Sequence, residues 1–133
     1  MKITERELFW LVGILEGEGH FRFYTTQEIV LTMTDEDVMM KAALIFGKLT
    51  GEYCSIKERP RLTTGGLTAY NINLCGQRAR IVMQAVVRHM GDRRRQAIWR
   101  SLNRVKVRNR LEKEKSKQDL FELMGLSTSK ESA

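Results

Sequence analysis

Two glutamates beside a pair of glycines are the first candidates for chemistry in this chain. Glu16 and Glu18 close an apolar run that reads LVGILEGEG over residues 11–19. A carboxylate near the last turn of a helix opposes the helix dipole by roughly 0.3–1 kcal/mol, and an apolar helix places it near a desolvated junction. A cation should offset these charges, supplied either by arginine or lysine or by a divalent metal.

A shared metal site is the more informative of these alternatives. Two chains related by a twofold axis along this helix would bring both Glu18 carboxylates together. Oxygen ligands of this kind suit Mg²⁺, which keeps several waters and also binds phosphate oxygens. A magnesium site built from two copies of the chain is therefore one prediction for this segment, and neutralisation by an arginine or lysine is the other.

The glycines point to close helix packing. Gly13 and Gly17 are four residues apart, so they share one helix face on which a second backbone can approach closely. Glycine inside a helix costs roughly 0.5–1 kcal/mol relative to alanine, which implies a packing requirement. A second interpretation, that Gly17 or Gly19 simply ends the helix, is compatible with the first.

A helix must carry these residues. Thr4 and Glu7 have capping-box spacing, and residues 8–15 are apolar on every side of the helix that follows. Such a helix is covered all round, and a domain of 133 residues has little room to surround it. We therefore expect a second chain to supply the missing side.

Alternation with a period of two predicts two β-hairpins. Residues 21–33 form the first, with a short polar turn near Gln27, and residues 53–74 form the second around a loop at 60–66. The inward positions of the second hairpin include Cys54, Ile56, Tyr70, Ile72 and Leu74.

Three further helices alternate with these hairpins. A cap at residues 34–37 starts the second helix, which ends at Gly51, and Gly76 opens a third that ends at Gly91. We expect the third helix to bury one stripe and a fourth to run from Arg93 to about Lys117; the stripe is Ile81, Val82, Ala85, Val86 and Met90. The order predicts an α+β fold, αββαββα, with a four-stranded antiparallel sheet carrying helices on one face. We expect one domain over residues 1–117 and a C-terminal tail, partly disordered, over 118–133.

Polar side chains collect on the other face of the predicted sheet. A twisted antiparallel sheet can lie along the major groove of DNA with alternate side chains reaching base edges. An ordinary solvated face would look similar apart from its carboxylates, and only Glu28 interrupts this one. The residues that share the face by parity are Arg22, Tyr24, Thr26, Thr32, Lys57, Arg59, Asn71 and Asn73.

The excess positive charge lies in one block. The net charge of +7 comprises zero over residues 1–92, +9 over 93–117 and −2 over 118–133. Such a block favours a polyanion, most simply nucleic acid, although a solvated charged helix has the same composition.

The rest of the composition indicates a soluble, cytoplasmic protein. Cys54 and Cys75 lack metal-ligand spacing, so we expect reduced, buried thiols. The charged N-terminus is unlike a signal peptide, and the longest apolar run is too short to cross a bilayer, so we expect neither secretion nor a membrane.

Residues 11–19 resemble the LAGLIDADG motif, with valine for its first alanine and glutamate for both aspartates. The helix before the motif, the hairpin after it and the order of elements to about residue 110 are also similar to the LAGLIDADG homing endonucleases, which are encoded in introns and other mobile elements. A single motif implies a homodimer, paired through the first helix. The interface residues are then Leu8, Leu11, Val12, Gly13 and Glu16.

The resemblance also implies roles for particular residues. Glu18 would be a metal ligand and a catalytic residue, and Gly17 would offer its carbonyl. Asp35 would stand in the water network beside the scissile phosphate, while Arg93 or Arg94 would contact phosphate or stabilise charge.

These implications predict a sequence-specific, magnesium-dependent endonuclease that cuts double-stranded DNA at a long, nearly palindromic site. The rival prediction is a non-cleaving binder of the same fold, either a maturase for intron RNA or a DNA-binding regulator. An unrelated α+β interaction domain is the third alternative.

Overall fold

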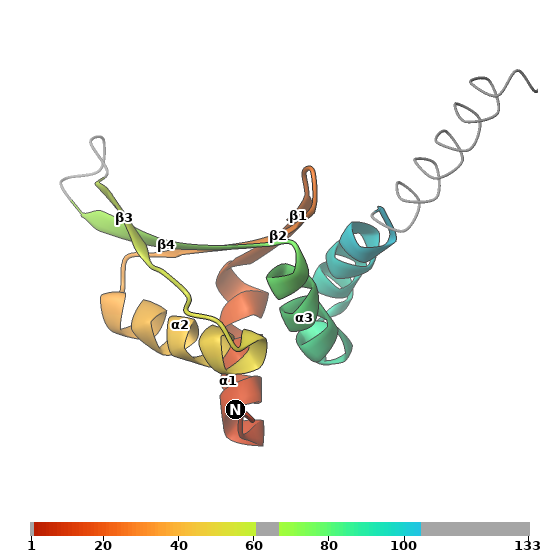
Figure 1. Ribbon diagram of the computed structural model, residues 1–133, viewed down its shortest axis with the longest axis horizontal. Coiled ribbons are helices and arrows are strands. Elements are labelled where there is room, and N and C mark those ends of the chain that lie inside the picture. Colours follow the sequence, from red (N-terminus) through yellow and green to blue (C-terminus); the bar gives the residue numbers. More distant parts are fainter. Residues whose placement is uncertain (1, 61–66, 105–133) are drawn as a thin grey trace, which may run out of the picture. The chain divides into compact units, whose positions relative to one another are not determined.

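A computed structural model describes residues 2–60 and 67–104, and residues 1–102 form one compact unit. Figure 1 shows the elements in chain order. They are α1 (Glu5–Glu18), β1 (Gly19–Phe23), β2 (Gln27–Met33), α2 (Glu36–Thr50), β3 (Lys57–Pro60), β4 (Thr68–Cys75), α3 (Gln77–Val86), the short 3₁₀ helix η1 (Val87–His89) and a helical segment at residues 92–104.

The four strands form one antiparallel sheet in the order β1-β2-β4-β3. The two hairpins therefore meet through β2 and β4, which lie at the centre. Helices α1, α2 and α3 all lie on one side of this sheet (Figure 1). The α+β fold predicted from the sequence, with its four-stranded antiparallel sheet, is confirmed.

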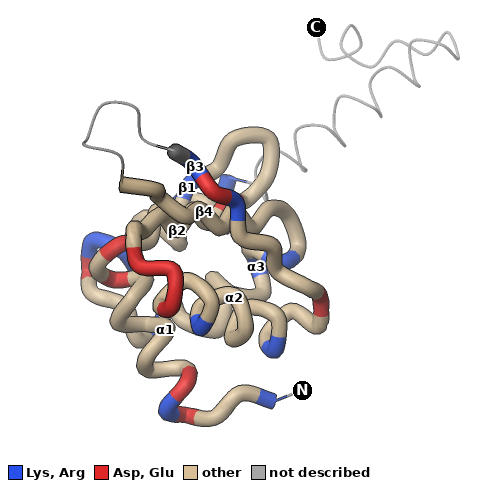
Figure 2. The backbone as a smooth tube through the Cα atoms, turned by 90° about the vertical axis from the view of Figure 1, so that its left-hand side faces the viewer, with Lys and Arg blue, Asp and Glu red and all other residues tan. Residues whose placement is uncertain are grey.

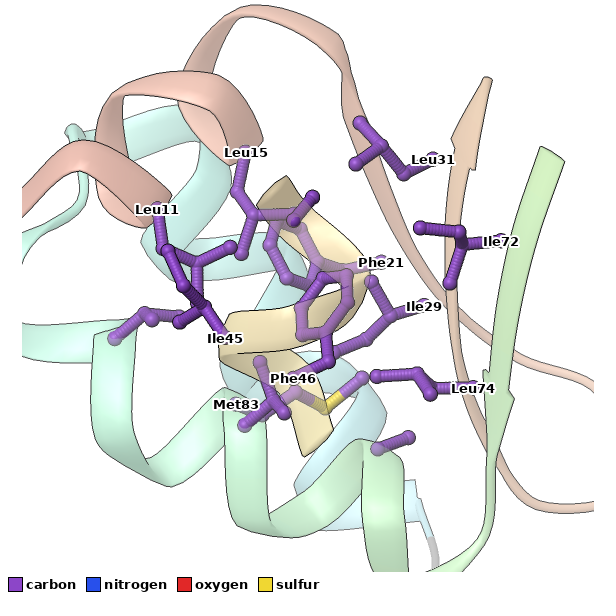
Figure 3. Packing of buried hydrophobic residues seen from close by; sticks show 14 of the residues in the cluster. Leu11, Leu15, Phe21, Ile29, Leu31, Ile45, Phe46, Ile72, Leu74 and Met83 are labelled. Atoms are coloured by element: carbon purple, nitrogen blue, oxygen red, sulfur yellow. The ribbon is translucent and has the colours of Figure 1, made fainter. Parts of the chain in front are cut away.

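The core lies between the sheet and the helices. Leu11 and Leu15 of α1 are fully buried and point toward α2 and the sheet, close to Ile45 and Phe21 (Figure 3). Alternate residues of the central strands complete this layer, because successive side chains of a strand point to opposite faces. The buried residues of β2 and β4 are Ile29, Leu31, Ile72 and Leu74.

Local signals fix the helix ends. Thr4 caps α1 in a complete capping box with Glu7, as the sequence predicts. Asp35 rather than Thr34 caps α2, since its carboxylate accepts a hydrogen bond from the Val38 amide at 3.3 Å. Gly51 ends α2 in the left-handed region at φ 75°, a conformation in which glycine has no Cβ penalty.

Several element boundaries differ from the predictions. The third strand begins at Lys57 instead of Tyr53, and the first turn lies before Gln27, which is buried. α3 is rotated from the expected stripe, so that Ile81 and Ala85 are only half-buried. Its buried residues are Ala79, Val82, Met83 and Val86.

The two cysteines differ in environment. Cys54 is buried, but Cys75 is exposed, so the prediction of a second buried thiol is wrong. Cys75 pairs with Glu28 in the sheet register, which places it on the face away from the core. The predicted domain boundary at residue 117, and the end of the fourth helix, lie outside the described residues.

Among residues 2–60 and 67–104, no helix is both long and apolar enough to cross a membrane.

The start of α1 should make part of the stability depend on pH. A hydrogen bond from Lys48, 2.7 Å away, and one from the Thr4 backbone lower the pKa of Glu7 from 4.5 to about 2. Because the folded-state pKa lies below the unfolded value, this stabilisation is complete above pH 4.5 and disappears as the pH falls toward 2. In urea unfolding, Glu7→Gln should therefore be less stable than wild type at pH 7 and differ little from it near pH 2.

Glu5→Gln, in the same helical turn, is the matched control. An equal effect of both changes at pH 7 would show that general helix-dipole charge, and not the Glu7 contacts, is responsible.

Candidate functional site

The acidic motif lies where α1 passes directly into β1. Gly19 is both the C-cap of α1 and the first residue of β1, and its amide donates to the Leu15 carbonyl. A Cβ at Gly19 would lie 2.8 Å from that carbonyl oxygen and 2.9 Å from the Leu15 side chain. The absence of a side chain therefore lets the strand begin immediately against the last helical turn.

Glu16 and Glu18 occupy different surroundings at this junction. The Glu16 carboxylate lies against the backbone of Gly91, where a Cβ would come within 2.5 Å of its Oε1. Glu18, the last residue of α1, is exposed and has no ion pair within the described part of the chain. Glu16 is also exposed and likewise forms no ion pair among the described residues, so the two carboxylates differ here in the contact of Glu16 with Gly91.

An arginine supplies the positive charge expected at the end of α1. The last turn of α1 contains no basic residue, but Arg94 Nε donates to the Glu16 carbonyl at 3.1 Å. A cation at a helix C-terminus interacts favourably with the dipole and satisfies an otherwise free carbonyl. Arg94 therefore links the helical segment 92–104 to the acidic motif, while Arg93 is exposed.

The part of the chain that the structure describes does not cover α1 on all sides. Phe9 is 49 % exposed, and Cβ atoms built at Gly13 and Gly17 meet nothing within 4 Å. The predicted interface residue Leu11 is fully buried in its own core, so it cannot face a partner chain. Leu8 and Val12 are half-buried, and Gly13 and Glu16 are exposed.

The sheet face away from the helices is largely polar. Residues that pair directly in an antiparallel sheet point to the same face, so the register defines its members. In β3 two basic residues flank Glu58, which belongs by register to the opposite face (Figure 2). The outer-face residues are His20, Arg22, Glu28, Val30, Thr32, Lys57, Arg59, Ala69, Asn71, Asn73 and Cys75.

Not every predicted DNA-contacting residue is equally accessible. Asn71 is only 3 % exposed and accepts a hydrogen bond from Thr32 at 2.7 Å, so its expected role in base contact is not supported by its position. Arg22, Lys57 and Arg59 are exposed, as is Asn73. Tyr24 and Thr26 lie in the turn between β1 and β2, where Tyr24 is exposed and Thr26 is half-buried.

Asp35 and Glu18 lie beyond the same end of the first hairpin, the end away from its turn. Gly19, which follows Glu18, pairs with Leu31 at this end of the β1–β2 ladder, and Asp35 comes shortly after Leu31 in the chain. The Asp35 carboxylate is used as the cap of α2. Within residues 2–60 and 67–104, no three His, Cys, Asp or Glu side chains come together as a metal site.

Three polar residues near the first hairpin were not expected from the sequence to have a role. Gln27 and Ser101 are buried, and the Ser101 hydroxyl donates to the Arg22 carbonyl at 3.0 Å. Glu28 pairs with the Arg22 guanidinium. A three-residue turn would have predicted the Arg22–Glu28 pairing, but the Ser101 contact spans 79 residues and has no local signal.

A separate apolar groove of about 540 Å³ lies along α2 and residues 51–56. It includes Leu44, Tyr53 and Cys54 and none of the residues predicted for DNA or metal binding. Burial raises the pKa of the Cys54 thiol, although Arg78 opposes this shift. The groove is therefore not part of the candidate site.

Comparisons of the chain with protein-family models, with curated proteins and with solved structures found no significant match.

The junction should tolerate no side chain at residue 19. Gly19→Ala places its Cβ against the Leu15 backbone, which cannot move without disturbing the core, so we expect a loss of about 1–3 kcal/mol in the free energy of unfolding. Denaturant unfolding at a protein concentration at which the chain is monomeric measures this loss.

Gly13→Ala is the matched control. Its Cβ meets nothing within 4 Å, and alanine is the better helix former, so this change should stabilise the monomer by up to about 1 kcal/mol. Equal destabilisation by both substitutions would contradict the close approach at Gly19.

Proposed function

We propose that this chain is a divalent-metal-dependent endonuclease for double-stranded DNA that acts as a homodimer, as its resemblance to the LAGLIDADG homing endonucleases implies. The observation that carries the proposal is the exposed Glu18 carboxylate at a helix-to-strand junction, next to a sheet whose outer face is polar. In this proposal the helix α1 would form the dimer, the junction would bind the metal and the sheet would contact the DNA.

The free side of α1 supports pairing between two copies. Gly13 lies opposite Leu11 and Leu15 on the helix, and its lack of a side chain would let two helix backbones approach closely. Phe9 lies one turn earlier on the same side and leaves half of its apolar surface exposed. Burial of this stripe against a second copy would remove that apolar surface from water.

The donor set at the end of α1 fits a hard divalent cation as half of a site. Glu18 would contribute a carboxylate oxygen and Gly17 a backbone carbonyl, both of which suit Mg²⁺. One chain offers too few ligands, so the second chain, water and phosphate oxygens would complete the coordination. Bound there, the ion would make water a better nucleophile and neutralise charge on the phosphate.

The other residues would bind and orient the duplex. Arg22, Lys57 and Arg59 would face the DNA from the outer side of the sheet, and Arg93 would contact phosphate from the helical segment. Arg94 would act differently, because its bond to the Glu16 carbonyl holds the end of α1 in place. Glu16, packed against Gly91, would shape the junction without binding metal.

Dimerisation should depend on the absence of a side chain at residue 13. Gly13→Leu should weaken the dimer by roughly 5- to 150-fold, since overpacking of a close interface costs about 1–3 kcal/mol. The isolated chain should remain folded, because space around Gly13 is open. Sedimentation equilibrium of the full chain measures the first effect and circular dichroism the second.

Gln84→Leu places the same leucine side chain at an exposed position of α3 and should leave the dimer unchanged. A wild-type chain that stays monomeric at micromolar concentration would count against pairing through α1.

Glu18→Gln should abolish magnesium-dependent cleavage and leave specific DNA binding within about tenfold of wild type, a difference of about 1.4 kcal/mol. The amide keeps the shape of the side chain but loses the charge that holds the metal. Binding without metal should even tighten, because two carboxylates no longer repel the phosphates. Cleavage and gel-shift assays on a selected duplex measure both quantities.

The matched control is Glu16→Gln, which should retain most cleavage. Wild-type cutting by Glu18→Gln, or loss of cutting by Glu16→Gln in a folded dimer, would assign the wrong carboxylate. Protein that binds a selected duplex but never cuts it with Mg²⁺ would instead support the non-cleaving alternative.

A further inference from the structure

Arg22 is held in one orientation on the outer face of the sheet. Its Nε donates to Glu28 Oε1 at 2.7 Å, and its Nη2 donates to the same oxygen. The two residues are direct partners in the β1–β2 register. The Arg22 side chain is nevertheless 56 % exposed, whereas that of Glu28 is only 13 % exposed.

The backbone of Arg22 is fixed as well. The buried Ser101 hydroxyl donates to the Arg22 carbonyl at 3.0 Å, and Gln27 donates to the Ser101 carbonyl at 3.4 Å. Gln27 in turn accepts from the Gly76 amide through its own carbonyl. The backbone and the guanidinium of Arg22 are therefore both restrained before any ligand binds.

This geometry leaves one edge of the guanidinium available. Arginine has five N–H donors, and the carboxylate occupies the edge formed by Nε and Nη2. The end formed by Nη1 and the second hydrogen of Nη2 still presents two parallel donors. Two parallel donors match the O6 and N7 acceptors of guanine in the major groove.

Building on the proposed function, we propose that Arg22 reads a guanine in each half-site and that Glu28 is the positioning residue that sets its specificity. A guanidinium free to rotate could bind any nearby phosphate, which carries no sequence information. The Glu28 carboxylate opposes that use in two ways, since it occupies one edge of the guanidinium and repels phosphate. The other polar residues of the outer face are cationic or neutral, and this role accounts for the one carboxylate among them, Glu28.

In the first step of the test, the whole chain is used to select bound duplexes from a randomised library in the absence of divalent metal. In the second step, its affinities for single-base variants of the selected site are measured. Wild type should prefer guanine at one position of each half-site by about tenfold or more. Arg22→Lys keeps the charge but lacks the paired donors, so it should lose this preference at that position alone.

Glu28→Gln should also reduce the preference for guanine, yet bind all duplexes as tightly as wild type or more tightly. In an Arg22→Lys background, Glu28→Gln should leave base preference unchanged, because the effect passes through Arg22. Glu58→Gln, which removes a carboxylate from the far edge strand, is the matched control and should leave the preference intact.

Loss of affinity for all sequences on Arg22→Lys, with guanine preference retained, would overturn the inference. So would a change in preference on Glu28→Gln that persists without Arg22, which would mean that Glu28 contacts a base itself. Sequence-specific binding without cutting would contradict only the proposed cleavage, whereas failure of wild type to bind duplex DNA would overturn the proposed function and the inference together.

Discussion

The direct junction between α1 and β1 is the constraint on which the rest of the structure depends. No linker separates the two elements, because Gly19 belongs to the last turn of the helix and to the first pair of the ladder. Leu15, one turn before Gly19, is anchored in the core, and Gly19 itself pairs with Leu31. The position of Glu18 between them is thus fixed by apolar packing on one side and by strand pairing on the other.

The sheet divides its two faces between stability and recognition. One face buries Ile29, Leu31, Ile72 and Leu74 against the helices, and the period of two sends their neighbours outward. Polar residues on the outer face therefore do not weaken the packing of the core. Their side chains can instead be suited to the molecules that they contact. The pair formed by Arg22 and Glu28 is restrained twice on this face, because Ser101 also donates a hydrogen bond to the Arg22 carbonyl.

The parts of this structure that the sequence predicted are those with local signals. The capping box at Thr4 and Glu7, the alternation along β2 and β4 and the glycine at Gly51 each depend on residues a few positions apart, and these elements formed as expected. The contacts that escaped prediction join distant segments. Arg94 meets the carbonyl of Glu16 across 78 positions, and Ser101 meets Arg22 across 79.

The assignment of Leu11 to the dimer interface was wrong for a related reason. An apolar run predicts burial but not which side is buried by the same chain, so the sequence could not separate Leu11, which faces the core, from Phe9, which is 49 % exposed. The same two sides of α1, one buried and one uncovered, matter for the candidate site. Motif residues of one chain place a carboxylate, while the uncovered side of α1 leaves room for a second chain to place another.

Two hydrogen bonds that involve arginines connect the acidic motif and the sheet into one unit. The helical segment 92–104 contacts α1 through Arg94 and the first hairpin through Ser101, which lies two turns further along the same segment. Residues between these contacts, including the buried Ile98, anchor the segment in the core. A rotation of the hairpin relative to α1 would have to break one of the two hydrogen bonds or expose Ile98. The segment therefore adds two restraints to the direct junction between α1 and β1, one near the carboxylate proposed to bind metal and one at the arginine proposed to read a base.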